Sequence, residues 1–318
     1  MTALDGGREL HDAVVVGGGA AGLAAATWIA RYRRPVAVLD GGEPRNQWVA
    51  RAHGYLGSDP VDPVELLRAA REQLVRYEEV ELCEGMAERA WRRDDGAFVV
   101  EGGDLRLAGR RLVLATGVRD SFPEVERFFE HYGADVFHCP TCDGYEARDR
   151  EVVAFGWGED MTGFALTLRG WAARVTIVTD GRPFEGDEDC RRRLSLAQVP
   201  VIEDDAVALL GTRGALEGVR LQSGRVLPCQ LAFFSIAHEP RTEIAAQLGC
   251  RLTAEGCIEV DGEAATSVPG VYAAGDVTPG LQLLQVAAAA GATAGVACAR
   301  SLRGEGGMPD AWRGQPPG

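Results

Sequence analysis

Two cysteines separated by two residues are the most chemically suggestive feature of this sequence. Cys139 and Cys142 lie in the segment HCPTCDGYE, with His138 before them and Asp143 directly after. Such a pair can be a redox disulfide, two of the four ligands of a zinc ion, or two ordinary buried thiols. The three alternatives predict different proteins, so the elements around the pair must help to decide between them.

A glycine-rich turn near the N-terminus has the flanking elements that a dinucleotide site requires. The sequence predicts an apolar strand, a turn containing Gly17, Gly19 and Gly22, a helix, and a second strand that ends at Asp40. The glycines permit a tight turn and close approach of the backbone to a pyrophosphate, whose charge the helix N-terminus faces. Asp40 stands where an acid accepts hydrogen bonds from a ribose. We therefore predict a dinucleotide site at this turn.

A second unit of the same kind follows the cysteine pair. Gly156 and Gly158 take the first two glycine positions, Asp180 lies beside the end of the next strand, and Met161 replaces the third glycine. Because the third glycine allows close packing of helix on strand, this copy is degenerate. The repeat predicts an α/β protein with two Rossmann-like domains.

Length and charge agree with a globular protein of this size. The chain has 318 residues, which exceeds the usual size of one domain, and a net charge of −14, which argues against nucleic acid or an anionic membrane as a main partner. Glycines interrupt the apolar stretch 13–30, and Pro279 and two glutamines interrupt 277–299, so we expect buried segments rather than membrane spans. The N-terminus lacks the pattern of a signal peptide, which predicts a cytoplasmic protein.

The order and spacing of the motifs resemble those of the low-molecular-weight thioredoxin reductases, which are class II pyridine nucleotide-disulfide oxidoreductases, and their close flavoprotein relatives. The matching segments, within about residues 12–303, are GGGAAG, LATG, CPTCDGYE, SIAHEPRTEI and PGVYAAGDV. The resemblance implies a homodimer in which an FAD domain, residues 1–118 plus 246–318, is interrupted by an inserted domain, residues 119–245. The inserted domain is of the pyridine-nucleotide type and carries the cysteine pair.

The resemblance also implies which residues hold the cofactor. The glycine turn and Asp40 bind the adenosine diphosphate half of FAD, Asp276 binds the ribityl chain, and the alanine-rich helix predicted over about 282–302 points its N-terminus at the flavin. The full set of implied FAD residues is Gly17, Gly19, Ala20, Ala21, Gly22, Asp40, Asn46, Thr116, Gly117, Gly275, Asp276, Gln285 and Val286.

For the cysteine pair, the resemblance implies a dithiol that exchanges electrons with FAD. A zinc site would need a second pair of ligands, which is not found, and inert thiols would not need this spacing, so we predict no metal. Cys142 is implied as the partner of the flavin, Cys139 as the partner of the substrate, and Asp143 as the group that moves the proton. A position at a helix start would lower the thiol pKa. His53 and His138 are further candidates for proton transfer.

Two departures from the family concern the electron donor. Thr179, Asp180 and Gly181 stand where NADPH-dependent members have His-Arg-Arg, and Leu284-Gln285-Val286 replaces their Arg-Gln-Ala near the flavin. An acid there repels the 2′-phosphate of NADPH and suits the 2′-hydroxyl of NADH. The segment DGGEPRNQWVARAHGYLG resembles instead a branch with dithiol oxidases that depend little or not at all on pyridine nucleotide.

We therefore predict an FAD-dependent oxidoreductase that acts on a disulfide or dithiol of a protein or a small molecule. Gly156, Gly158 and Asp180 are the candidate nucleotide residues, and their retention favours NADH-driven reduction. The alternatives are an NAD(P)H-independent dithiol oxidase with oxygen as acceptor, a ferredoxin-linked reductase and, in another class, a non-catalytic redox-sensing flavoprotein.

Overall fold

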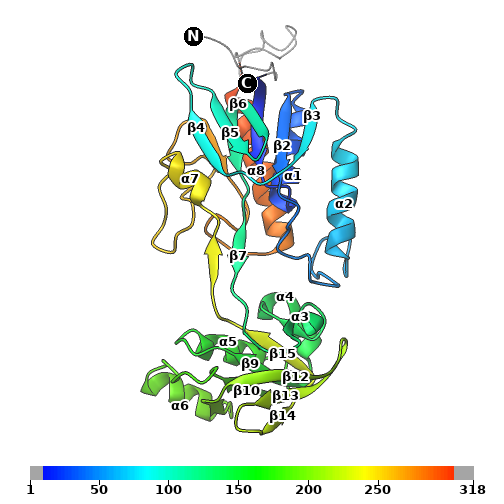
Figure 1. Cartoon of the computed structure of the whole chain (residues 1–318), viewed down its shortest axis with the longest axis vertical. Helices are drawn as coiled ribbons and strands as arrows, with labels where there is room; N and C mark the ends of the chain where they lie inside the picture. Colours follow the sequence, from blue (N-terminus) through cyan, green and yellow to red (C-terminus); the bar gives the residue numbers. More distant parts are fainter. Residues whose placement is uncertain (1–9, 304–318) are drawn as a thin grey trace, which may run out of the picture. The chain divides into compact units, whose positions relative to one another are not determined.

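The computed structural model describes residues 10–303, which form two compact units (Figure 1). Within this range the first unit contains residues 10–47, 64–119 and 239–303, and the second contains 48–63 and 120–238. We expected residues 48–63 to belong with the first unit, but they pack on the second. There the Ala50 N–H donates to the Gly133 carbonyl at 3.1 Å, and the Trp48 ring lies 5.2 Å from that of Phe129.

The first unit is built on one seven-stranded sheet in the order β3-β2-β1-β6-β5-β4, with β17 also paired to β6. The neighbours of β1, β2 and β17 run parallel, whereas β4, β5 and β6 form an antiparallel meander. The strands are β1 (His11–Val16), β2 (Val36–Asp40), β3 (Val80–Glu84), β4 (Arg89–Arg92), β5 (Phe98–Gly102), β6 (Leu105–Leu114) and β17 (Val271–Ala273).

Helices of the first unit bury both faces of this sheet. Its helices are α1 (Ala20–Arg31), α2 (Pro63–Leu74), α7 (Glu243–Gln247) and α8 (Leu284–Ser301). Apolar side chains of α1, α2 and α8 pack on one face, where Ile29 and Cys298 are fully buried. Ile244 of α7 and Ile258 pack on the other face. The continuous apolar sequences of β1 and β2 follow from this, because a parallel strand covered on both sides has no solvent face.

The second unit has a five-stranded parallel sheet in the order β11-β10-β9-β15-β8. Helices α5 and α6 cover one face, and a three-stranded antiparallel sheet with the short helix α3 covers the other. The parallel strands are β8 (Val136–Phe137), β9 (Glu151–Phe155), β10 (Arg174–Val178), β11 (Val201–Ile202) and β15 (Leu231–Phe234); the antiparallel ones are β12 (Ala206–Thr212), β13 (Ala215–Leu221) and β14 (Val226–Pro228). The helices are α3 (Phe128–His131), α4 (Pro140–Asp143), the 3₁₀ turn η1 (Gly144–Ala147), α5 (Met161–Leu168) and α6 (Glu188–Leu196).

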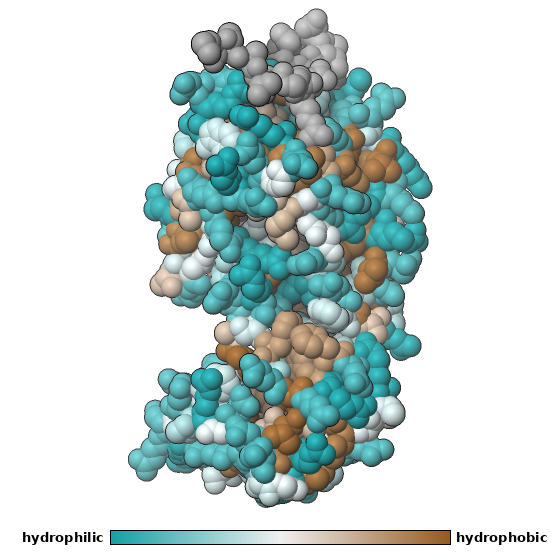
Figure 2. All heavy atoms as spheres, viewed as in Figure 1, coloured by the Kyte–Doolittle hydropathy of each residue, from teal (hydrophilic) through white to brown (hydrophobic). Residues whose placement is uncertain are grey.

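The chain passes twice between the units, through β7 (Val118–Asp120) and β16 (His238–Pro240), which pair with each other. A mixed sheet and a parallel sheet, whose parallel strands are flanked by helices, confirm the predicted α/β class with two Rossmann-like folds. Hydrophilic residues predominate on the face drawn in Figure 2. Within residues 10–303 no helix is long and apolar enough to cross a membrane.

Candidate active site

The residues implied for FAD in the first unit follow the carboxyl ends of four neighbouring strands. Gly17 follows β1, Asp40 ends β2, Thr116 follows β6 and Gly275 follows β17. Because β2, β1, β6 and β17 are parallel and adjacent, these ends meet at one edge of the sheet. This edge is where open α/β sheets bind their ligands.

The geometry of the glycine turn fits a pyrophosphate. Gly17 has φ +109°, and a Cβ there would lie 2.2 Å from the Ala115 carbonyl oxygen; a Cβ on Gly22 would lie 1.8 Å from the Gly17 carbonyl oxygen. Gly19, which precedes Ala20 and Ala21 at the start of α1, has open space at its Cβ position and no side chain capping the helix. The turn therefore requires glycine, and it leaves the uncapped helix N-terminus accessible to an anion.

The alanine-rich helix α8 packs unusually closely on α1. A Cβ on Gly291 would lie 2.0 Å from the Ala21 carbonyl oxygen, and one on Gly295 would lie 2.4 Å from that of Ala25. Small residues thus let the two helix backbones touch, which explains the run of alanines through packing. The predicted cofactor residues Gln285 and Val286 lie in the first turn of α8, which has no side-chain cap.

Asp40 has a protein partner that the sequence did not indicate. Its carboxylate accepts hydrogen bonds from Nε and Nη2 of Arg71, at 3.0 and 2.6 Å, and from the Gly42 N–H at 2.9 Å. Arg71 also donates to the Gly18 carbonyl at 3.0 Å. The acid at the end of β2 is therefore tied to α2 and to the glycine turn, and Arg71 places a cation beside the turn.

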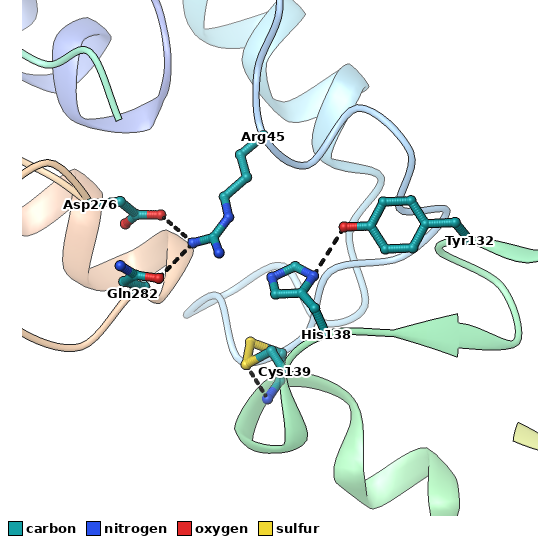
Figure 3. Close-up of a disulfide and its surroundings, with 7 residues drawn as sticks. Arg45, Tyr132, His138, Cys139, Asp276 and Gln282 are labelled. Carbon is teal, nitrogen blue, oxygen red and sulfur yellow. Dashed lines mark hydrogen bonds and ion pairs between the residues drawn. A yellow bond between two sulfur atoms is a disulfide. The ribbon is translucent and has the colours of Figure 1, made fainter. Parts of the chain in front are cut away.

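A second arginine organises the region around Asp276. Arg45 Nη1 donates to Asp276 Oδ2 at 2.9 Å and to Gln282 Oε1 at 2.7 Å (Figure 3). These bonds connect the segment containing Asn46 with the approach to α8. Arg45 therefore fixes the orientation of the Asp276 carboxylate, which is the group predicted to contact the ribityl chain. Arg45 directly precedes Asn46 in the segment DGGEPRNQWVARAHGYLG, but no sequence pattern indicated that it contacts Asp276.

Thr116 and Gly117 make contacts within the first unit. The Thr116 hydroxyl donates to the Arg241 carbonyl at 2.6 Å, and the Arg241 N–H donates to the Gly117 carbonyl at 2.9 Å. Gly117 adopts φ +68°. These bonds fix the crossing segment of the chain at the sheet edge, while Arg241 Nε is buried without a hydrogen-bond partner among the described residues.

In the second unit, Cys139 and Cys142 form a disulfide with their Cα atoms 5.2 Å apart. Cys139 is the N-cap of α4, and its sulfur accepts the Cys142 N–H at 3.1 Å. We expected a helix dipole to activate the pair, but α4 contains only Pro140–Asp143 and η1 follows it. A single helical turn has a small dipole, so the local N–H to sulfur bond is the better-supported source of thiolate stabilisation.

Ionisable groups surround the disulfide. The pKa of Asp143 is raised to about 7, first by burial and then by the charge of Glu146, against the lowering effect of the charge of His53. His138 Nδ1 lies 3.0 Å from the Tyr132 hydroxyl (Figure 3). An acid with a pKa near neutrality, directly after a redox cysteine, can both give and take a proton at physiological pH. Glu146 was not singled out from the sequence.

The second glycine turn is filled by its own side chains. Gly156 has φ +153°, and a Cβ there would lie 2.4 Å from the Met161 sulfur. Gly158 precedes Asp160, whose Oδ2 accepts the Ser235 hydroxyl at 3.1 Å at the start of α5. Met161 is fully buried, and the guanidinium of Arg182 lies 4.0 Å over the Trp157 ring. The Met161 sulfur thus lies against the Gly156 backbone, and a carboxylate stands at the start of α5.

Asp180 follows β10 at the same sheet edge as Gly156, as the sequence predicted, and has φ +56°. Burial raises its pKa, the charges of Asp205 and Glu124 raise it further, and that of Arg182 lowers it. A site with three acids beside one arginine repels a 2′-phosphate. Within residues 10–303 no group of three metal-ligand side chains is found.

Fold, disulfide and sequence together define the class of the protein. Residues 11–291 match the family described as pyridine nucleotide-disulphide oxidoreductase, so the chain belongs to that family. Membership confirms the predicted FAD-dependent oxidoreductase of thioredoxin-reductase type, and the family binds FAD and pyridine nucleotide.

Three relatives show how closely the chain follows this class. The thioredoxin reductase sirT of Leptosphaeria maculans is 30% identical, with 90% of this chain and 93% of that protein covered. The crystal structure of HlmI superposes with a TM-score of 0.87 at 36% identity, covering 93% of each chain. A putative thioredoxin reductase TrxB from Bacillus anthracis gives 0.85 at 28% identity, covering 93% of this chain and 99% of that one.

Proposed function

We propose that Cys139 and Cys142 are the catalytic dithiol of this oxidoreductase, and that its substrate is a disulfide or dithiol of a protein or small molecule. The observation that carries the proposal is the Cys139–Cys142 disulfide next to a carboxyl whose pKa is about 7. The other six cysteines are free thiols. FAD, when bound, supplies a reversible acceptor for the two electrons of the pair.

The two cysteines have different roles in this proposal. Cys142 exchanges electrons with the flavin, and Cys139 exchanges with the substrate. Asp143 takes a proton from the thiol when the disulfide forms and returns it when the disulfide is reduced. The hydrogen bond from the Cys142 N–H to the Cys139 sulfur supports the formation of a thiolate at Cys139.

The first unit supplies the FAD site in this proposal. The glycine turn and the uncapped start of α1 accept the pyrophosphate, with Arg71 beside them, and Asp276, oriented by Arg45, hydrogen-bonds the ribityl chain. Open space at Gly19 and the steric requirement for glycine at positions 17 and 22 support this assignment. We also propose domain boundaries close to the observed units, a homodimeric assembly and a cytoplasmic location.

Replacing Cys142 with Ser tests the redox assignment. We expect the variant to retain FAD, measured by its absorbance after gel filtration, and to lose electron exchange between flavin and thiols in anaerobic titrations. Cys257→Ser, at a partly buried free cysteine, is the matched control and keeps full exchange. Full turnover by Cys142→Ser would refute the assignment.

Direct dithiol oxidation is a second candidate for the direction of electron flow. It is favoured by the degenerate turn of the second unit, where Met161 replaces the third glycine and the Asp160 carboxylate accepts the Ser235 hydroxyl at the start of α5. Anaerobic additions of NADH, NADPH and a simple dithiol separate the candidates. Bleaching of the flavin by NADH supports reduction with Asp180 as the selective acid, whereas bleaching by dithiol alone, reversed by oxygen, supports a dithiol oxidase.

A further inference from the structure

A group of ionisable side chains connects the buried Asp143 with the surface of the second unit. Asp143 is 7% exposed, and the charged groups that act on it are Glu146 of η1 and His53 of the segment 48–63. An acid that accepts and releases a proton in each catalytic cycle needs a route for that proton. Because Asp143 is buried, direct exchange of its proton with bulk water does not provide this route.

Glu146 is the first member of this group beyond Asp143. Its two carboxylate oxygens have different surroundings: Oε1 lies 3.4 Å from His53 Nε2, whereas Oε2 is buried with no hydrogen-bond partner among the described residues. A buried carboxylate oxygen without a donor is unfavourable, because it has lost its hydrogen bonds to water. Asp143 precedes Glu146 by three residues across α4 and η1, and the charge of Glu146 acts on the Asp143 carboxyl.

His53 continues the group toward solvent. Its Nδ1 lies 3.0 Å from Asp59 Oδ1, so the imidazole stands between two carboxylates. The side chain of Asp59 is 53% exposed, and that of His53 is 26% exposed. The paired backbone hydrogen bonds between Ala52 and Val61, 2.7 and 2.9 Å long, close the loop that holds both residues. The ring therefore has a fixed place at the rim of the site.

We propose that Glu146 and His53 are positioning residues that hold the proton of Asp143 and pass it to and from solvent beside Asp59. The inference rests on the proposed role of Asp143 in the dithiol reaction. When a thiol gives its proton to Asp143, Glu146 takes that proton, and His53 takes one from Glu146 and releases one to water beside Asp59. Each transfer breaks one O–H or N–H bond and forms another, so no further reactant is consumed.

Opposite shifts in the titration of Asp143 provide the test. Glu146→Gln removes the negative charge that favours the protonated acid, so the midpoint should fall, by about one pH unit. His53→Ala removes the cation that favours the carboxylate, so the midpoint should rise. A purely structural role would not predict opposite signs. Glu185→Gln, at an exposed site in the same unit, is the control and should cause no shift.

Infrared spectroscopy of the FAD-loaded protein measures the midpoint directly. The carbonyl band of a neutral carboxylic acid is followed from about pH 5 to about pH 9, a range in which most carboxyls are already ionised. Asp143→Asn identifies the band by removing it. If Glu146→Gln does not fold, as judged by circular dichroism, Glu146→Asp keeps the charge and should show a smaller change of midpoint.

Chemical rescue tests the transfer itself. His53→Ala should slow dithiol oxidation about tenfold at neutral pH, and added imidazole should restore both the rate and the midpoint. The inference is overturned if neither variant moves the band beyond the control, if both move it in one direction, if no band belongs to Asp143, or if imidazole has no effect. None of these results touches the role of Cys142, which the Cys142→Ser titration decides separately.

Discussion

The buried carboxyl of Asp143 makes a quantitative prediction about stability. Its pKa rises from 3.8 to about 7 on folding, first because of burial and then because of the charge of Glu146. The folded protein therefore binds this proton more tightly than the unfolded chain does. The resulting stabilisation is complete below the unfolded value near 4 and is lost as the pH rises through about 7.

The size of the effect follows from the shift. One pKa unit corresponds to about 1.4 kcal/mol, so the whole shift is worth about 4 kcal/mol as an upper limit. Between about pH 5 and about pH 8, linkage predicts that this group alone lowers the free energy of unfolding by about 2 to 3 kcal/mol. Asp143 is only 7% exposed, so solvent screening reduces the value little.

Asp143→Asn removes the ionisation with almost no change in side-chain shape. Urea unfolding of the FAD-loaded protein, followed by circular dichroism at several pH values, should show that the difference in unfolding free energy between variant and wild type changes by those 2 to 3 kcal/mol. Asp149→Asn, whose wild-type side chain is 91% exposed in the same unit, should follow the wild type. Equal pH dependence in Asp143→Asn and wild type would refute a carboxyl pKa near 7.

Two further substitutions test packing and a buried ion pair in the first unit. Gly291→Val should destabilise the protein by about 1 to 3 kcal/mol and weaken FAD retention on gel filtration, because its Cβ would meet the Ala21 carbonyl oxygen at 2.0 Å; exposed Thr293→Ala should do neither. Arg34→Met should cost about 3 kcal/mol in thermal or urea unfolding while leaving the thiol chemistry intact, because Arg34 is 1% exposed and its Nη1 donates to Asp12 at 3.2 Å. Undiminished stability in either variant would contradict these packing arguments.

Local sequence predicted the parts of the site that local geometry determines. Gly17, Gly22 and Asp40 could be placed because a strand, a tight turn and a helix follow each other directly, and the sequence requirements of such a unit are strict. The same holds for the disulfide, whose cysteines are three residues apart. Met161 was rightly identified as the residue that distinguishes the second turn from the first.

Contacts between residues far apart in the chain could not be predicted from the sequence. Arg45 and Asp276 are 231 positions apart, and no pattern of residues indicates that these two charges meet. The segment 48–63 follows β2 directly, so chain continuity placed it in the first domain, whereas its backbone and ring contacts place it with the second unit. His53 and Glu146 could therefore be recognised as neighbours only once the fold was known.

The two glycine turns of this chain differ in the groups that surround their second glycine. In the first unit a Cβ at the second glycine, Gly19, would have open space; in the second unit a Cβ at the equivalent Gly158 would lie 2.5 Å from Asp160 Oδ1 at the start of α5. A phosphate held at the start of α5 would stand beside this carboxylate, and like charges at short distance repel. Because a disulfide pair supports electron flow in either direction, we propose that residues 156–161, and not the pair itself, determine whether pyridine nucleotide takes part.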